Sequence, residues 1–270
     1  RETRNCYFIS NSLFLPKIEM VAEGYKINIV GAGISGLIAA LVLEKEGYTV
    51  TIYEATDRAG GRVKTDTYDG YQLDHGFQVL LNAYPMAKKY LDLEALSLQK
   101  FLPGAVIFKY GKKKALGDPL RNLSLLFPTL LSNIGNFFDK VNILKLNLEL
   151  KKISVEQVFS SKETSTMTYL KEKGFSDDII SSFFKPFFSG IFLEPNLETS
   201  SRMFQFVYKM FGEGLAVLPK SGIGAITDQL LAQLKRSKIH FNAPVQEVLE
   251  GKLILADGRE LQSQYTIIAT

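Results

Sequence analysis

The spacing of hydrophobic and polar residues changes twice within residues 26–53. Residues 26–30 and 49–53 read as short strands in which apolar residues alternate with other residues, and residues 36–46 between them are apolar at helical spacing. Gly47 stands where the helix is expected to end. Residues 27–43 carry no charge, but the change of period within them indicates a strand and a helix rather than a membrane span. The pattern predicts a βαβ unit.

Two hairpins are predicted further along the chain. Residues 63–68 and 71–74 are short strand-like runs, and the Asp69-Gly70 dipeptide between them is typical of a two-residue hairpin turn. The second hairpin is expected around Gly111, with the lysines of the cluster at residues 109–114 on its solvent side.

The middle of the chain has a different character. Between residues 85 and 215 helical periods dominate and phenylalanine is abundant, which indicates a second domain inserted into the first. After this segment the alternation of strands and helices returns. The elements expected there are a glycine loop, a helix, a strand, two strands of a meander and a buried strand, at residues 219–224, 225–235, 238–241, 245–249, 252–255 and 265–269.

Composition and charge exclude several classes of function. The 32 basic and 28 acidic residues leave a net charge of +4, and aromatic residues do not alternate with the basic ones, so we expect no nucleic-acid partner. The single cysteine, Cys6, excludes a disulfide framework, and His75 and His240 lie far apart, so we expect no metal site. A reducing, cytoplasmic compartment fits this composition best.

A glycine-rich turn joins the first predicted strand to the first predicted helix. Residues 31–36 read Gly-Ala-Gly-Ile-Ser-Gly, a G-x-G-x-x-G motif in the context typical of dinucleotide binding. Gly31 permits the tight turn, Gly33 lets the backbone approach a pyrophosphate, and Gly36 lets the helix pack against the strand. Ile34 and Ser35 complete the predicted phosphate site at the helix N-terminus. The alternative is a glycine turn without a ligand.

An acidic residue follows the second predicted strand. Glu54 comes eighteen residues after Gly36, where such folds place a carboxylate that accepts hydrogen bonds from both ribose hydroxyls. A carboxylate at this place repels a 2′-phosphate, which disfavours NADP. The neighbouring Ala55 is included in the predicted site.

A glycine pair and an arginine distinguish FAD from NAD. Gly60 and Gly61 let the chain run close to an extended ligand, and Arg62 offers planar donors suited to phosphate. Gly76 closes the predicted hairpin that follows. An NAD-dependent dehydrogenase would explain the first glycine motif alone, so the combined pattern favours FAD.

In these residues the sequence resembles the flavoprotein group of flavin amine oxidases, protoporphyrinogen oxidases and phytoene-desaturase-like enzymes. The residues that carry the resemblance are Gly31, Gly33, Gly36, Glu54, Gly60, Gly61 and Arg62. The resemblance implies that residues 60–62 follow the FAD pyrophosphate and ribityl chain, that Val245 presents its backbone to the adenine, and that Thr270 lies beside the cofactor. Residues 183–195, 199–202 and 218–225 look most like the carotenoid-desaturase-like branch.

The fold implied is α/β, a Rossmann-like FAD-binding domain with a mixed sheet and a β-meander, interrupted by an inserted α+β substrate domain. Residues 25–84 and 216–270 are interpreted as the two parts of the FAD-binding domain, residues 85–215 as the insert, and residues 1–24 as an N-terminal extension. The family's C-terminal cofactor segment, with its Gly-Asp pair, is absent from these residues. We therefore interpret the chain as truncated at its C-terminal end.

The resemblance implies an FAD-dependent oxidase or desaturase that removes a hydride from an apolar substrate or an amine. Two alternatives stay open: a redox-neutral flavin-dependent isomerase, and a truncated, non-catalytic nucleotide-binding homologue. No residue is assigned a catalytic role, and no oligomeric state is predicted. Lys220 lies in the glycine loop, but nothing in its surroundings matches the lysine that some flavin amine oxidases use.

Several residues have a functional and a structural interpretation. His75 is either a group facing the flavin or an ordinary turn residue, and His240 is expected to be structural. The phenylalanines of residues 183–192 either line an apolar substrate channel or form a core. Residues 120–138 either rest on a membrane surface or pack within the insert, which leaves a peripheral membrane contact open.

Overall fold

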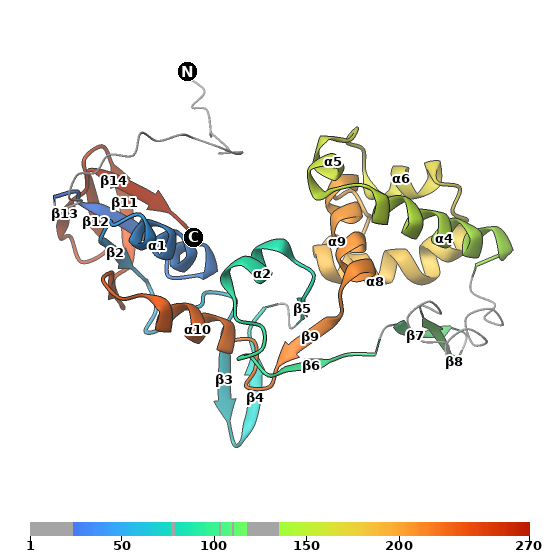
Figure 1. Cartoon of the computed structure of the whole chain (residues 1–270), viewed down its shortest axis with the longest axis horizontal. Helices are drawn as coiled ribbons and strands as arrows, with labels where there is room; N and C mark the ends of the chain where they lie inside the picture. The colour runs from blue at the N-terminus through green and yellow to red at the C-terminus, as the bar shows by residue number, and fades with distance from the viewer. Residues whose placement is uncertain (1–23, 77–78, 103, 110, 118–134) are drawn as a thin grey trace.

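A computed structural model describes residues 24–76, 79–102, 104–109, 111–117 and 135–270. Figure 1 shows two lobes, one built on a sheet and one built of helices, connected by extended chain. Most of the predicted N-terminal extension and most of residues 120–138, one interpretation of which is a contact with a membrane surface, lie outside the described residues.

A parallel four-stranded sheet forms the centre of the first lobe. Its strands are β1 (Ile27–Val30), β2 (Val50–Tyr53), β10 (Lys238–His240) and β14 (Tyr265–Ile268), in the order β10-β2-β1-β14. Helix α1 (Ile34–Lys45) connects β1 to β2 and begins two residues earlier than the sequence pattern predicted. The predicted βαβ unit is thus present in the structure.

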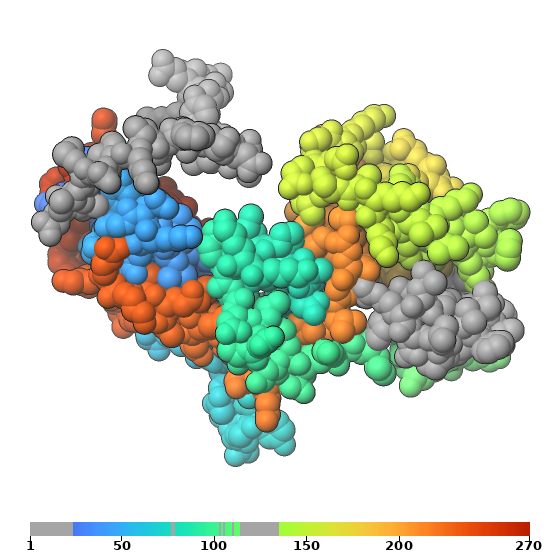
Figure 2. All heavy atoms as spheres, viewed as in Figure 1, coloured from blue at the N-terminus to red at the C-terminus, as the bar shows by residue number. Residues whose placement is uncertain are grey.

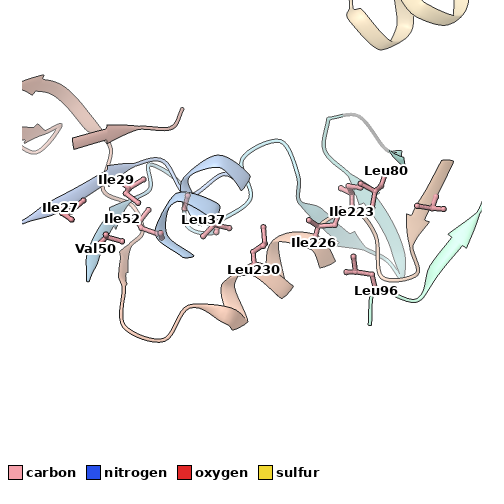
Figure 3. Close-up of a cluster of buried hydrophobic side chains, with 14 residues drawn as sticks. Ile27, Ile29, Leu37, Val50, Ile52, Leu80, Leu96, Ile223, Ile226 and Leu230 are labelled. Atoms are coloured by element: carbon pink, nitrogen blue, oxygen red, sulfur yellow. The ribbon is translucent and has the colours of Figure 1, made fainter. Parts of the chain in front are cut away.

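The core of the first lobe lies between this sheet and two helices. Ile29 and Ile52 project from neighbouring strands, Leu37 from α1 and Leu230 from α10 (Ala225–Gln233), and all four side chains are fully buried (Figure 3). Burial of each such side chain stabilises the fold by about 1.5–3 kcal/mol. This packing fixes the start of α1 against the end of β1, which is where the glycine turn lies.

The C-terminal strand differs from its prediction. The apolar sequence of residues 265–269 predicted a buried strand, but Tyr265 is 59% and Ile268 is 63% exposed. Strand β14 pairs with β1 alone and forms an edge of the sheet, so it has described neighbours on one side only. The prediction of a buried strand is therefore wrong for the described structure.

Both predicted hairpins are confirmed. Strands β3 (Thr65–Tyr68) and β4 (Tyr71–Asp74) pair from Tyr68 opposite Tyr71, and Asp69 and Gly70 both have positive φ angles, 49° and 79°, as a type I′ turn requires. Figure 2 shows this hairpin projecting from the body of the first lobe. The second hairpin consists of β7 (Gly104–Lys109) and β8 (Lys112–Gly117), with Gly111 in the turn at a φ of 71°.

A three-stranded antiparallel sheet lies where the two lobes meet. Strand β9 (Ala216–Pro219) pairs with both β5 (Leu80–Leu81) and β6 (Leu98–Lys100). Helix α2 (Pro85–Tyr90) packs against the core of the first lobe through Ala87 and Tyr90. The core of the first lobe therefore includes residues from the beginning of the segment predicted as an insert.

The second lobe is a bundle of helices around a phenylalanine-rich core. Its elements are α4 (Phe137–Lys152), α5 (Val155–Ser160), α6 (Thr166–Glu172), α7 (Asp177–Ile179), the π-helix η2 (Ile180–Phe184), α8 (Lys185–Phe192) and α9 (Ser201–Glu213). Phe184 and Phe188 are buried, and the Phe188 ring lies 4.7 Å from that of Phe204. Core packing accounts for these two phenylalanines, whereas Phe183, Phe187 and Phe192 are only partly buried.

The predicted meander completes the first lobe. Strands β11 (Val245–Leu249), β12 (Lys252–Leu255) and β13 (Glu260–Gln262) form a separate antiparallel sheet in that order. Leu253 and Leu255 point to its buried side. The sheet lies between β10 and β14 in the sequence and so brings the chain back to the central sheet.

Candidate functional site

Two glycines of the motif that joins β1 to α1 are required by the chain itself. Gly31 has a φ of 98°, and a Cβ atom there would lie 2.9 Å from the carbonyl oxygen of Ala269. A Cβ atom on Gly36 would lie 2.0 Å from the carbonyl oxygen of Gly31. Real Cβ atoms do not make such contacts, so glycine at these two positions lets β1, α1 and the end of β14 pack closely.

Gly33 is different, because the described chain does not require a glycine there. Its φ is −71°, which any residue adopts, and no described atom lies within 4 Å of a Cβ built on it. Gly33 is the N-cap residue of α1 and offers no capping side chain. Ser35, in the first turn, is exposed, whereas Ile34 packs on the core. The open space at the N-terminus of α1 is suited to an anionic ligand, because the first N–H groups of a helix have no partner within it.

The carboxylate of Glu54 lies beneath this turn. Glu54 is 8% exposed, and its Oε2 atom accepts a hydrogen bond of 2.7 Å from the backbone N–H of Ala32. Its Oε1 atom accepts bonds from the backbone N–H and the hydroxyl of Thr56, at 3.0 and 2.8 Å. The side chain predicted to bind ribose therefore also holds the glycine turn in place.

The charge state of Glu54 follows from these contacts. Burial alone would raise the pKa of Glu54, but the hydrogen bonds from Ala32 and Thr56 outweigh it and lower the pKa below its usual value. The group is therefore an ionised acceptor at neutral pH. A carboxylate has about four acceptor positions, and the three bonds from the protein leave room for one more. Hydrogen bonds to both ribose hydroxyls would require one of the Thr56 bonds to be released.

The second glycine motif touches the first. The N–H of Gly60 donates to the carbonyl oxygen of Ala32 at 2.9 Å, and Gly60 forms a parallel bridge with Gly33. A Cβ atom on Gly60 would lie 2.7 Å from the carbonyl oxygen of Val63, and one on Gly61 would lie 3.6 Å from the Cα atom of Gly33. The structure thus brings the two motifs into one backbone-lined surface.

Three other predicted residues lie at the exposed rim of this surface. Ala55, Arg62 and Gly76 are all exposed, and Arg62 forms no ion pair with a described residue. A Cβ atom on Gly76 would lie 2.8 Å from the Arg62 carbonyl oxygen, and the φ of Gly76 is 65°. Gly76 therefore lets the end of the hairpin pack against Arg62.

Two predicted residues from the C-terminal part of the chain approach the same place. The Cγ2 atom of Thr270 would lie 3.4 Å from a Cβ atom on Gly31. Val245 begins β11, two residues after Ala243, whose N–H donates to the carbonyl oxygen of Glu54 at 2.9 Å. These contacts thus bring Gly31, Gly33, Glu54, Gly60 and Thr270 close together, and the contacts of the predicted site residues with a cofactor stay predictions.

Some residues that hold the site were not found from the sequence. Thr227 at the start of α10 donates a 2.6 Å hydrogen bond to the carbonyl oxygen of Val63. In the glycine loop before α10, Ile223 and Gly224 donate backbone hydrogen bonds to Asp74 and Thr65. Thr56 could have been identified by its place two residues after Glu54, but contacts across about 160 residues leave no local signal.

The structure shows the contacts of His75 and His240 and the exposure of Lys220. His75 lies with Nε2 2.6 Å from Asp66 Oδ2, and Arg58 binds the same carboxylate. Hydrogen bonds from His75 and Arg58 lower the pKa of Asp66. His240 stacks on Tyr53 with 5.3 Å between ring centroids, and Lys220 is exposed. The expected structural role of His240 agrees with this packing.

A family model and individual proteins match the sequence of this chain. Residues 34–270 match the family model of flavin containing amine oxidoreductases. An L-amino-acid oxidase from Trimeresurus stejnegeri is 32% identical over 156 residues, which cover 54% of this chain and 30% of that protein. The chain thus spans less than a third of the length of this relative.

Solved structures of similar fold include two oxidoreductases. An oxidoreductase from Methanosarcina mazei superposes with a TM-score of 0.67 at 23% identity, over 90% of this chain and 58% of that one. A putrescine oxidase superposes with a TM-score of 0.61 at 22% identity, over 91% of this chain and 58% of that one. At this level of identity the likeness shows the fold alone, which is the mixed α/β fold of these enzymes.

Proposed function

Since this chain belongs to the family of flavin-containing amine oxidoreductases, we propose that it binds FAD through the surface around Gly33 and forms part of an FAD-dependent oxidoreductase. The observation that carries the proposal is the open space in front of Gly33, at the N-terminus of α1 and directly beside the ionised Glu54. A turn made for packing alone would not need glycine at this position.

The fold supports this proposal at a finer level. The parallel order β10-β2-β1-β14, with α1 as a crossover helix, supports a Rossmann-like dinucleotide-binding domain. The helical lobe lies between β6 and β9 in the sequence, as an inserted substrate domain would. On this basis we propose a two-part FAD-binding domain, residues 25–84 and 216–270, around the insert predicted at residues 85–215, with the start of the insert moved past β6 because residues 85–100 pack with the first lobe.

The described residues fit the parts of FAD. The N–H groups at the start of α1, beside Gly31 and Gly33, would face the pyrophosphate, and Glu54 would accept a hydrogen bond from the adenosine ribose. Residues 60–62 would follow the chain toward the flavin. Val245 and Thr270 would lie beside the adenine and the pyrophosphate end of the site.

The family indicates the class of reaction, and the relatives indicate the class of substrate. FAD, when bound, supplies the hydride acceptor, and the protein positions the substrate and excludes water. We propose an amine or amino acid as substrate, because the relatives include an L-amino-acid oxidase and a putrescine oxidase. Phe183, Phe187 and Phe192, partly buried in the helical lobe, would suit its apolar part. The desaturase-like branch and a cytoplasmic location stay predictions.

A single methyl group tests the proposal. Gly33→Ala introduces no clash with a described atom and no backbone strain, so the variant should fold as the parent does. If the pyrophosphate packs against this backbone, the added methyl group should weaken FAD binding by about tenfold or more. The measurement is flavin absorbance and fluorescence of the full-length protein during titration with FAD.

Gly190→Ala in α8 is the matched control, since a Cβ atom there also meets no described atom. It should leave FAD affinity unchanged. Equal FAD affinity of the two variants would contradict the proposed position of the pyrophosphate. A full-length parent protein that is colourless and cannot be reconstituted with FAD would contradict the proposed function itself.

A further inference from the structure

Helix α4 carries apolar side chains on the side that faces away from the protein. Phe137, Leu144 and Leu148 are 73%, 46% and 49% exposed. On a helix with about 3.6 residues per turn, these positions fall on one narrow stripe, which we call the α4 stripe. Figure 2 shows the yellow-green atoms of this part of the chain on the outer surface of the helical lobe.

The opposite side of α4 is held firmly in the lobe. Leu146 and Leu150 are each 1% exposed and belong to the core that includes α9. Asp139 is buried and accepts hydrogen bonds from the backbone of Asn136 and from both the N–H and the hydroxyl of Ser176. The helix is thus fixed in position by one face, and the α4 stripe is presented to the outside by a rigid element.

Lysines lie on both sides of the α4 stripe. Lys145 and Lys152 lie on one side and Lys151 on the other, and all three are exposed. None of the three forms an ion pair with a described residue. The nearby Glu149 does not offset them, because it is paired with Lys173 at 2.6 Å. The surface therefore combines exposed apolar side chains with an excess of positive charge.

We propose that α4 lies on an anionic membrane surface, with the α4 stripe in the interface and the three lysines at the level of the lipid phosphates. Such an arrangement is that of an interfacial amphipathic helix, whose lysines also extend their apolar stems along the stripe. A protein partner fits less well, because lysine is depleted in the buried centre of protein interfaces. This inference goes beyond the proposed function and does not depend on FAD.

The length of α4 supports contact with the surface rather than insertion across it. A helix of 16 residues is about 24 Å long, shorter than the hydrocarbon core of a bilayer. Among the described residues, no helix combines the length and the apolar character of a membrane span.

Co-sedimentation of the full-length protein with vesicles tests the proposal. The vesicles contain phosphatidylcholine and phosphatidylserine in equal proportions. The parent protein should bind them, and this binding should weaken when salt is added. Lys145→Gln, Lys151→Gln and Lys152→Gln together should reduce binding by at least about tenfold, because each lysine near such a surface contributes about 1 kcal/mol. Phe137→Gln, Leu144→Gln and Leu148→Gln together should reduce it by a similar factor.

A matched control replaces exposed apolar residues of the β3–β4 hairpin. Tyr68→Gln, Tyr71→Gln and Leu73→Gln together remove side chains that are at least half exposed and should leave vesicle binding unchanged. Equal binding of this control and the stripe variant would overturn the proposal. So would binding that does not require phosphatidylserine.

Two further outcomes would identify another occupant of the α4 stripe. A parent protein that is dimeric, and a stripe variant that is monomeric, would show an interface with a second copy of the chain. A stripe variant with a much lower Tm than the control would show that another segment of the chain covers the stripe. If the stripe variant does not fold, the lysine variant decides, since its substitutions are at exposed positions and unchanged vesicle binding would overturn the proposal.

Discussion

Gly36 and Gly33 stand three residues apart and are glycines for different reasons. Gly36 is a glycine because of the protein itself, since a side chain there would clash with the carbonyl oxygen of Gly31. The contact proposed for Gly33 is with the pyrophosphate. A side chain at Gly36 would therefore disturb the fold, and one at Gly33 would disturb the ligand.

Gly36→Ala is expected to destabilise the protein. The Cβ atom would lie 2.0 Å from backbone, so α1 must move away from β1, and the free energy of unfolding should fall by about 2–3 kcal/mol. Urea unfolding of the apoprotein measures this change, with Gly33→Ala as the reference that keeps its stability. Equal stability of the two variants would show that α1 adjusts without cost.

The residues of the glycine motifs are those that the sequence predicts best. Their spacing between a strand and a helix predicted Gly31, Gly33 and Gly36 at the start of that helix, and the family resemblance is confirmed by the match over residues 34–270. The hydrogen bond from Ala32 to Glu54 was not predictable, because it depends on how β2 lies beside β1. A motif indicates which residues are expected near a ligand. It does not show which groups of the protein donate hydrogen bonds to the side chains of those residues.

Among the elements, α1 and α10 are joined by one buried side chain. Glu44, near the end of α1, accepts hydrogen bonds from the backbone N–H groups of Lys235, Arg236 and Ser237 at 2.5–2.9 Å. Burial acts to raise the pKa of Glu44, but these bonds lower it to about 2. The carboxylate thus holds the connection between α10 and β10 in place.

This contact predicts a specific pH dependence. The pKa of Glu44 falls from 4.5 to about 2 on folding, so the carboxylate contributes about 3 kcal/mol of stability that is complete above 4.5 and is lost as the pH falls toward 2. Glu44→Gln should remove most of this contribution at neutral pH. Free energies of unfolding of both proteins between neutral and acid pH should therefore converge at the acid end. A constant difference across the range would contradict this explanation.

Local sequence determined some elements and not others. The turn at Asp69 and Gly70 was predictable because these residues adopt positive φ angles at low cost. The exposure of β14 was not, because the sequence of a strand does not say whether one or two strands pair with it. The π-helix at Ile180–Phe184 also had no sequence signal in an otherwise helical pattern.

At the scale of the whole molecule, the described residues form two large cores with no residue in common. One surrounds the parallel sheet, and the other surrounds Phe184, Phe188 and Phe204 in the helical lobe. A small cluster of Leu81, Ala83 and Met210 lies between them. A substitution in one core should therefore lower the stability of its own lobe and leave the stability of the other lobe unchanged.

Phe188→Ala tests this independence. Removal of a ring that is 1% exposed should destabilise the helical lobe by about 3–5 kcal/mol, while FAD binding at the glycine turn is kept. Calorimetry should show an early transition for the helical lobe and a later one for the sheet lobe. Phe138→Ala, at a position 72% exposed, should change stability by less than about 0.5 kcal/mol. A single transition that moves as a whole would show that the lobes unfold together.

The pairing of β6 with β9 determines how the helical lobe is attached. The chain leaves the first lobe along β6 and returns along β9, and Lys100 pairs directly with Val217. Because the two ends of the intervening segment are neighbours, a short hairpin linker can replace everything between them, or the corresponding segment of another family member can be grafted in. The helical lobe is therefore exchangeable as a unit, and chimaeras built at this junction would show which lobe determines the choice of substrate.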